Sequence, residues 1–309
     1  MTTPSIAADA ESVSIRRSVP IWLLLWRDKP ALVAAFWLLL IVACVFVGHP
    51  LFVDDAAVVN LSARNAAPGF EHGFLNLLGA DPLGRPLLPR LIVGARNTVM
   101  VAGSVVVIAL TAGGILGMLA GYLGGIVNTV IMRFADLLSS FPSLLLALIV
   151  LYVLEPSVAN LILVLAITRT AIYLRVTRAE VLELRERVFV DAARALGGSN
   201  AHILYKHISP MVLPTLGTIL TIDFASVMLS ESALSFLGIG IQPPEVTWGL
   251  MVSQGRNYLA SAWWLAFFPG LAIMLTALSA NLLSSWIRTV NDPTQRWRLE
   301  APAKPRTKE

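Results

Sequence analysis

Two carboxylates lie deep inside an apolar stretch, and they are the strongest candidates for chemistry in the sequence. Asp223 and Glu231 are eight residues apart, so on one helix they would lie about 12 Å apart along its axis. A charge at the centre of a bilayer is costly, so such a group should face a wet cavity, find a partner or be neutral. One hypothesis is that Asp223 or Glu231 lines a translocation pathway and meets a cationic solute group. The alternatives are a polar contact between packed helices, a site near the membrane interface and proton carriage in a secondary transporter.

Other reactive groups show no arrangement that supports catalysis or metal binding. The single cysteine, Cys44, excludes an internal disulfide, and the four histidines lack the spacing of metal ligands. The chain has no GxxxxGK[ST] phosphate loop, no G-x-S-x-G motif and no HExxH motif. We therefore expect no metal, no catalytic residue and no ATP-hydrolysing site. The sequence contains no paired catalytic motif, which argues against the alternative of a membrane enzyme that uses buried carboxylates.

A polar stretch at 190–198, VDAARALGG, has the features of a short helix displayed to a partner. Asp191 can cap or favour a helix N-terminus, and the small alanines that follow it let another surface come close. Gly197 and Gly198 can adopt the positive φ that ends a helix and turns the chain. A solvated amphipathic linker is the alternative for this stretch taken alone.

Three glycines recur at every fourth position in another apolar stretch. Gly113, Gly117 and Gly121 form two overlapping GxxxG patterns, which let two helices approach closely. We expect these glycines to pack helices within the chain, and contact with a partner chain is the alternative.

The composition predicts an all-α polytopic membrane protein. Of 309 residues, 56% are hydrophobic and 14% are charged, and the mean hydropathy is +0.74. These values exclude a disordered chain and argue against a soluble enzyme. Long apolar stretches indicate helices, because barrel strands alternate apolar and polar residues. The six predicted transmembrane helices cover 31–47, 99–122, 137–154, 158–174, 211–236 and 263–287.

The basic residues predict the orientation of the chain. Lysine and arginine gather before the first predicted helix, after the fourth and after the sixth, which all fall on one side. That side is expected to be the cytoplasm, and the net charge of +4 follows from this topology rather than from nucleic-acid binding. The expected segments are a cytoplasmic tail with an interfacial helix at 1–30, a first transmembrane helix at 31–47, an extracytoplasmic segment at 48–97, a five-helix core at 98–290 with a cytoplasmic loop at 177–209, and a cytoplasmic C-terminal tail at 291–309.

Several segments resemble the permease subunits of ABC importers. Asp191, Ala192 and Ala193, followed by Gly197, resemble the EAA-x3-G signature, with Asp in place of the usual Glu. Residues 81–96, DPLGRPLLPRLIVGAR, are similar to the DxLGRDxLSRLIxGAR element of dipeptide, oligopeptide and nickel permeases. Further similar segments are FPSLLLAL at 141–148, LSFLGIGIQPP at 234–244 and FPGLAI at 268–273. The pattern is closest to the second, C-type permease of the pair, although the charge of Arg169 departs from it.

The resemblance implies a type I importer fold in a bacterial inner membrane. Two homologous permeases would form one pathway, two cytoplasmic ATPase domains or subunits would bind ATP and Mg, and an extracytoplasmic binding protein would deliver the solute. The coupling element would contain Asp191, Ala192, Ala193, Gly197 and Gly198. Asp223 or Glu231 would then meet the cationic end of a peptide. The sequence leaves open whether the solute is a dipeptide, an oligopeptide, a nickel chelate or another compound.

Overall fold

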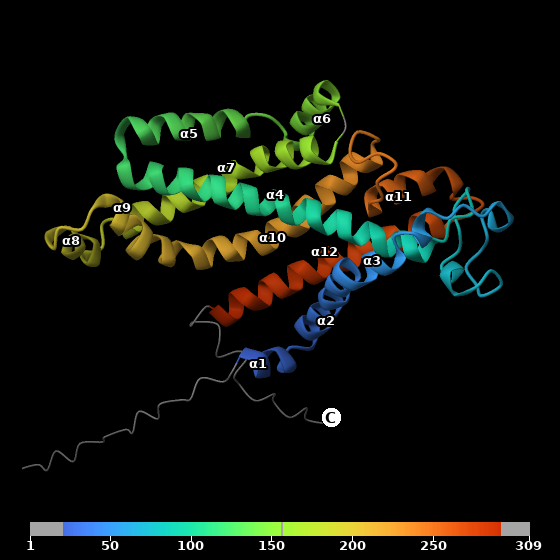
Figure 1. The fold of residues 1–309 in the computed structure, drawn as a ribbon. Helices are drawn as coiled ribbons and strands as arrows, with labels where there is room; N and C mark the ends of the chain where they lie inside the picture. Colours follow the sequence, from blue (N-terminus) through green and yellow to red (C-terminus); the bar gives the residue numbers. More distant parts are fainter. Residues whose placement is uncertain (1–20, 156, 292–309) are drawn as a thin grey trace, which may run out of the picture.

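The computed structural model describes residues 21–155 and 157–291, and this part of the chain is helical (Figure 1). Predictions for residues 1–20, 156 and 292–309, which include most of both tails, lie outside the described residues. The α-helices are α1 (Ile21–Arg27), α2 (Lys29–Ala43), α3 (His49–Phe52), α4 (Leu87–Leu123), α5 (Gly125–Ser139), α6 (Ser143–Leu154), α7 (Val158–Leu184), α8 (Val188–Ala195), α9 (Asn200–Ile203), α10 (Ser209–Phe236), α11 (Trp248–Gly255) and α12 (Trp264–Asn291). Two π-helical turns, η1 (Cys44–Gly48) and η5 (Leu204–Ile208), join α2 to α3 and α9 to α10.

Five helical segments of the described chain are long and apolar enough to cross a membrane. They are Lys29–Phe52, Leu87–Leu123, Val158–Leu184, Asn200–Phe236 and Trp264–Val290. A bent pair, α5 with α6, becomes a sixth crossing if its two halves count as one span. The all-α polytopic architecture predicted from the composition is therefore confirmed.

The prediction of a single third helix over 137–154 is wrong. Helix α5 ends at Ser139, α6 begins at Ser143, and the two are bent by 85°. Pro142 has no backbone N–H to donate, and it also disfavours helical geometry at Phe141. Helix α6 has 12 residues, or about 18 Å, which is less than the roughly 30 Å of bilayer hydrocarbon.

The second predicted helix begins earlier than expected, because α4 starts at Leu87 rather than near 99. The predicted division between 48–97 and 98–290 therefore falls inside a continuous helix of 37 residues. Polar residues hide this first part of α4 from a hydropathy pattern. Two of them have partners in other elements: Arg90 Nη1 lies 3.5 Å from Asp81 Oδ2, and the Asn97 amide donates to Glu245 Oε2 at 3.0 Å.

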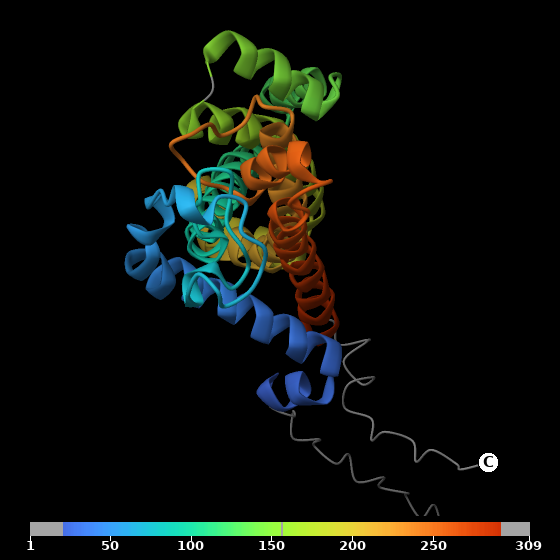
Figure 2. The same cartoon turned by 90° about the vertical axis from the view of Figure 1, so that its right-hand side faces the viewer.

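Helices α4, α7 and α10 form the centre of the fold. Helix α4 packs most extensively on α7, and α10 contacts α4, α7 and α12; the three lie side by side in Figure 1, with α5 and α6 along one side. Seen along its length in Figure 2, the molecule carries α2 and α12 on the side away from α5 and α6.

Short elements gather at the two ends of this helix array. Helices α8 and α9 lie at one end, and α11 lies at the other with the loops before α4 (Figure 1). Those loops include the 3₁₀ turns η2 (Asp55–Ala57), η3 (Leu61–Ala63) and η4 (Phe74–Asn76), and η6 (Arg256–Tyr258) follows α11. Helix α1 packs on the C-terminal part of α12 through a cluster of Leu24, Ala31, Trp286 and Val290. The array thus presents two chemically different ends.

Candidate functional site

The stretch singled out by sequence forms the short helix α8, which projects at one end of the array (Figure 1). Helix α8 begins at Val188, three residues before Asp191, so of the two roles expected for Asp191 the N-cap is wrong. Asp191 instead lies in the first turn, where its negative charge still interacts favourably with the helix dipole. It also pairs with Arg194 at 3.4 Å on the exposed surface.

Helix α8 ends in a Schellman turn built on the two glycines. Gly197 N donates to Arg194 O at 2.9 Å, and Gly198 N donates to Ala193 O at 3.0 Å. Gly197 has φ of +82°, as expected, but Gly198 does not have positive φ. Gly198 is needed for another reason, because a Cβ there would lie 2.8 Å from the Ala193 carbonyl oxygen.

One face of α8 is held firmly by neighbouring elements. Val190 is fully buried in a cluster that includes Ile203, Ile208 and Val212. Ser199 Oγ accepts from His202 N at 3.3 Å and so caps α9. The loop that follows α8 is therefore ordered by backbone hydrogen bonds, a side-chain cap and apolar packing.

The last turn of α4 supports α8 and α9 through one aromatic side chain. Tyr122 is 7% exposed, and its hydroxyl donates to Asn200 Oδ1 at 3.0 Å. The Arg194 guanidinium lies 5.6 Å from the centre of the Tyr122 ring, within range of a cation–π contact. Sequence reasoning missed Tyr122, because its partners follow it by more than seventy positions.

The opposite face of α8 is open. Val188 and Leu196 are 83% and 89% exposed, and Ala192 between them is also exposed. An apolar and small-residue surface on a fixed support is suited to docking against another protein. The structure thus displays the stretch that contains Asp191, Ala192, Ala193, Gly197 and Gly198, and its coupling role stays a prediction.

The three spaced glycines of α4 face α7. A Cβ on Gly113 would lie 2.6 Å from Tyr173 Cβ, and one on Gly117 would lie 2.6 Å from Thr177 Cβ. A Cβ on Gly121 would lie 2.8 Å from Val181 Cβ. Distances below 3.0 Å are not tolerated, so any larger residue would separate α4 from α7. This geometry favours packing within the chain over contact with a partner.

Asp223 pairs with a cation of the same chain. Its Oδ1 lies 3.2 Å from Arg169 Nη1, and Arg169 Nη2 donates to Ser230 Oγ at 3.0 Å. The side chains of Arg169 and Asp223 are 17% and 7% exposed. The charge of Asp223 is thus already compensated by α7, which explains how a charged Arg169 can occupy a transmembrane helix.

Glu231 is enclosed within the chain. It has no exposed surface, and its carboxylate accepts from Ser235 Oγ at 2.8 Å and from Ser232 Oγ at 3.3 Å. Helix α11 covers this region, since a Cβ on Gly249 would lie 2.6 Å from Ser232 Cα. The geometry favours a packing role for both acids, and contact with a solute stays a prediction.

The comparison with known families decides the class of this protein. Residues 113–297 match the profile of the family described as binding-protein-dependent transport system inner membrane component. The chain belongs to this permease family. The permease is accordingly a multi-pass component of an inner membrane and has no ATPase site of its own. It works with other components of an ABC importer and with a solute-binding protein.

Relatives of the permease match it along most of their length. It is 36% identical over 274 residues to the probable D,D-dipeptide transport system permease DdpC of Escherichia coli, covering 88% of the permease and 90% of the relative. The di/tripeptide permease DppC of Pseudomonas aeruginosa is also 36% identical over 274 residues, with the same coverage of 88% and 90%. The glutathione permease GsiD of Pectobacterium atrosepticum is 32% identical over 273 residues, 88% and 89% of the two chains. These relatives support the importer permease and not the proton-coupled secondary transporter.

Proposed function

We propose that this permease is the C-type subunit of an ATP-driven importer of dipeptides, oligopeptides or related small solutes. Relatives that are named as dipeptide and di/tripeptide permeases support this substrate class. The permease would form half of the translocation pathway, and a second, homologous permease would form the other half. An extracytoplasmic solute-binding protein would deliver the solute to the mouth of the pathway.

The α8 end of the array faces the cytoplasm in this proposal. Arginines gather around it, from Arg178 near the end of α7 to Arg194 in α8, and the positive-inside rule places such segments in the cytoplasm. Helix α1 and the C-terminal end of α12 pack together, so both termini would be cytoplasmic. The loops before α4 and helix α11 would then face the extracytoplasmic side.

Helix α8 couples the permease to two ATPase domains or subunits, which bind ATP and Mg. The open face of α8 on a rigid support is the observation that carries this role. A docking helix must transmit force, and α8 is held against α4 by the contacts of Tyr122 and against α10 by the cluster that contains Val190 and Val212. Asp191, Ala192, Ala193, Gly197 and Gly198 would therefore act as one unit.

Co-purification from the native membrane in mild detergent tests this assembly. We expect a second permease and one or two proteins with phosphate-binding loops to accompany the chain. Asp191→Lys should reduce the recovered ATPase at least several-fold and leave the second permease bound, because it reverses a charge on the exposed helix. Asp54→Lys changes an exposed acid at the other end and is the matched control. A chain that is recovered without any ATPase at every detergent strength would contradict the proposal.

A further inference from the structure

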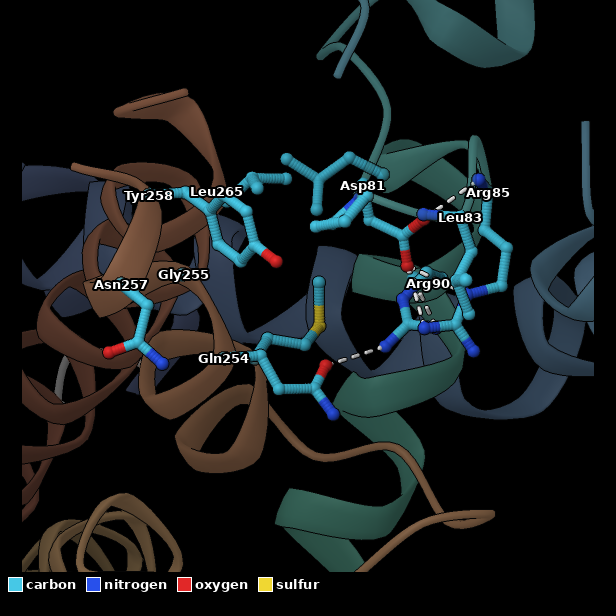
Figure 3. Close-up of a pocket in the computed structure, with 12 residues that line it drawn as sticks. Asp81, Leu83, Arg85, Arg90, Gln254, Gly255, Asn257, Tyr258 and Leu265 are labelled. Atoms are coloured by element: carbon cyan, nitrogen blue, oxygen red, sulfur yellow. Dashed lines mark hydrogen bonds and ion pairs between the residues drawn. The ribbon is translucent and has the colours of Figure 1, made fainter. Parts of the chain in front are cut away.

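A cavity of about 350 Å³ lies at the end of the molecule opposite α8. It is bounded by the loop that leads into α4, by the first turn of α4, by α11 and η6, and by Leu265 at the start of α12. Figure 3 shows these walls and the side chains that they contribute. The cavity involves neither α8 nor the acids of α10.

A buried arginine forms part of the wall. Arg90 is 3% exposed, although it is charged. Its Nη2 donates to Gln254 Oε1 at 3.1 Å, and its Nη1 lies 3.5 Å from Asp81 Oδ2. A buried guanidinium is normally held by short, direct contacts to an anion, whereas the contact of Arg90 to Asp81 is the longer one of 3.5 Å.

The carboxylate of Asp81 is engaged mainly by other groups. Its Oδ2 accepts from Arg85 Nε at 2.7 Å and lies 2.7 Å from Arg85 Nη2. Its Oδ1 accepts from the backbone N–H groups of Leu83 and Arg85, both at 2.9 Å. Asp81 therefore compensates Arg85 and caps its own loop, and it leaves Arg90 poorly compensated.

The charge of the cavity is consequently positive. Among its lining residues, Asp81, Arg85 and Arg90 are the charged ones, so two cations share a single carboxylate. Burying a cation without a full counter-charge is costly. An anion that entered the cavity would remove this cost, and the low polarity around Arg90 would strengthen the attraction.

The remaining walls suit an anion that carries an apolar body. Leu87, Met251 and Leu265 supply apolar surface, and the Tyr258 hydroxyl points from the opposite wall into the space in front of Asp81 and Arg90 (Figure 3). A few polar groups in a mainly apolar cavity are typical of a small-molecule site.

A second hollow, of about 710 Å³, continues the site toward the surface. It shares Leu83, Arg85, Arg90 and Gln254 with the cavity. It also adds Arg96 together with one acid, Glu245, so its three arginines, Arg85, Arg90 and Arg96, still outnumber its single carboxylate. A positively charged approach of this kind concentrates anions near the site.

We propose that the cavity around Arg90 binds one anionic group, a carboxylate or a phosphodiester, on a small ligand with an apolar body. Arg90 and the Tyr258 hydroxyl hold the anionic group, and the apolar wall holds the body. The ligand is either a solute that carries a carboxylate or the headgroup of a membrane lipid. This site does not depend on the transport function proposed above.

Equilibrium dialysis with labelled N-acetylleucine tests the site directly. The full-length permease is purified with its co-purifying subunits, in the absence of ATP and of the solute-binding protein. We expect about one saturable site per chain, and no saturable binding of the neutral N-acetylleucinamide. Arg90→Gln should raise the Kd at least tenfold, since the loss of a charged hydrogen bond commonly has this effect.

Three further variants separate binding from folding. Asp81→Asn keeps an oxygen acceptor for the loop but removes the competing charge, so it should lower the Kd several-fold. Tyr258→Phe removes one hydroxyl and no ion pair, and it should raise the Kd a few-fold. Arg64→Gln, at an exposed arginine outside the cavity, should leave the Kd unchanged. If Arg90→Gln fails to fold, the opposite changes in Kd that are expected for Asp81→Asn and Tyr258→Phe still test whether the cavity binds the anion.

Competition identifies the source of the anion. Short-chain phosphatidylglycerol that displaces the probe more strongly than unlabelled N-acetylleucine assigns the site to a lipid headgroup, and probe binding should then increase after lipid removal. The reverse order assigns the site to a carboxylate solute. The proposal is overturned if no saturable binding occurs before or after lipid removal, or if the amide binds equally well.

Discussion

At the scale of single residues, the ion pair between Arg169 and Asp223 is the contact with the clearest consequences. The two groups lie 3.2 Å apart on neighbouring transmembrane helices. Arg169 Nε is buried without a hydrogen-bond partner in the described chain. Each charge therefore depends on the other, and neither can be removed alone without leaving a buried charge uncompensated.

We expect Arg169→Gln or Asp223→Asn to lower the thermal midpoint of the permease in detergent. Each single change should cost about 3–5 kcal/mol, because it leaves one unpaired buried charge. The double variant should recover most of the loss. If the stability loss of the double variant equals the sum of the losses of the two single variants, the two charges are not coupled.

The Arg169–Asp223 pair also bears on the pathway hypothesis. If Asp223 is a structural partner, the double variant should retain uptake close to its normal rate. If Asp223 meets the cationic end of a peptide, uptake should fall although the double variant is folded. The comparison of stability with uptake thus separates the two hypotheses for this residue.

At the scale of elements, α8 shows how a local turn can determine the position of a helix. Gly197 has φ of +82°, and no atom lies within 4 Å of the Cβ that a larger residue would add there. Space is therefore available, and the constraint lies in the backbone alone. Asparagine tolerates this conformation, whereas a β-branched residue does not.

We accordingly expect Gly197→Val to insert normally and to lose ATP-driven uptake. Gly197→Asn should retain most of it, because the Schellman turn can still form. The measurement is uptake by membranes that contain equal amounts of each variant, with ATPase co-purification as a second readout. Unchanged uptake by a normally expressed Gly197→Val permease would eliminate the coupling role of the turn.

At the scale of the whole molecule, α4 runs from the end that holds the cavity around Arg90 to the end that carries α8. Its 37 residues extend over about 55 Å. Tyr122 near one end contacts Asn200 of α9, and Arg90 near the other lines the cavity proposed to bind an anion. The close packing of Gly113, Gly117 and Gly121 on α7 makes α4 and α7 a stiff pair between these ends.

The energy source is a property of the whole assembly. We expect uptake into vesicles loaded with ATP to continue when an uncoupler collapses the proton gradient, and to stop when the ATP is hydrolysed beforehand. Asp223 is paired with Arg169 and Glu231 is fully buried, an arrangement that favours structural roles over proton carriage. If uptake is lost on uncoupling while ATP is still present, the result would support the proton-coupled transporter instead.

Features that depend on neighbours in sequence could be predicted from the sequence. Apolar stretches long enough to span a bilayer indicated an all-α membrane protein, because every backbone hydrogen bond of a helix is local. The Gly197 turn was predictable for the same reason. The break at Pro142 was also local, but an averaged hydropathy pattern does not register a single missing N–H group.

Features that depend on distant residues were decided by the tertiary structure. Arg90 and Gln254 are 164 positions apart, and no periodicity links them. Whether Asp223 faces a solute or Arg169 depends on how α7 and α10 are rotated against each other. Residue types and spacing thus determined the class of protein and its display of α8. The partners of its buried charges were decided only by the folded arrangement of helices, because pairing requires that helices far apart in sequence meet in space.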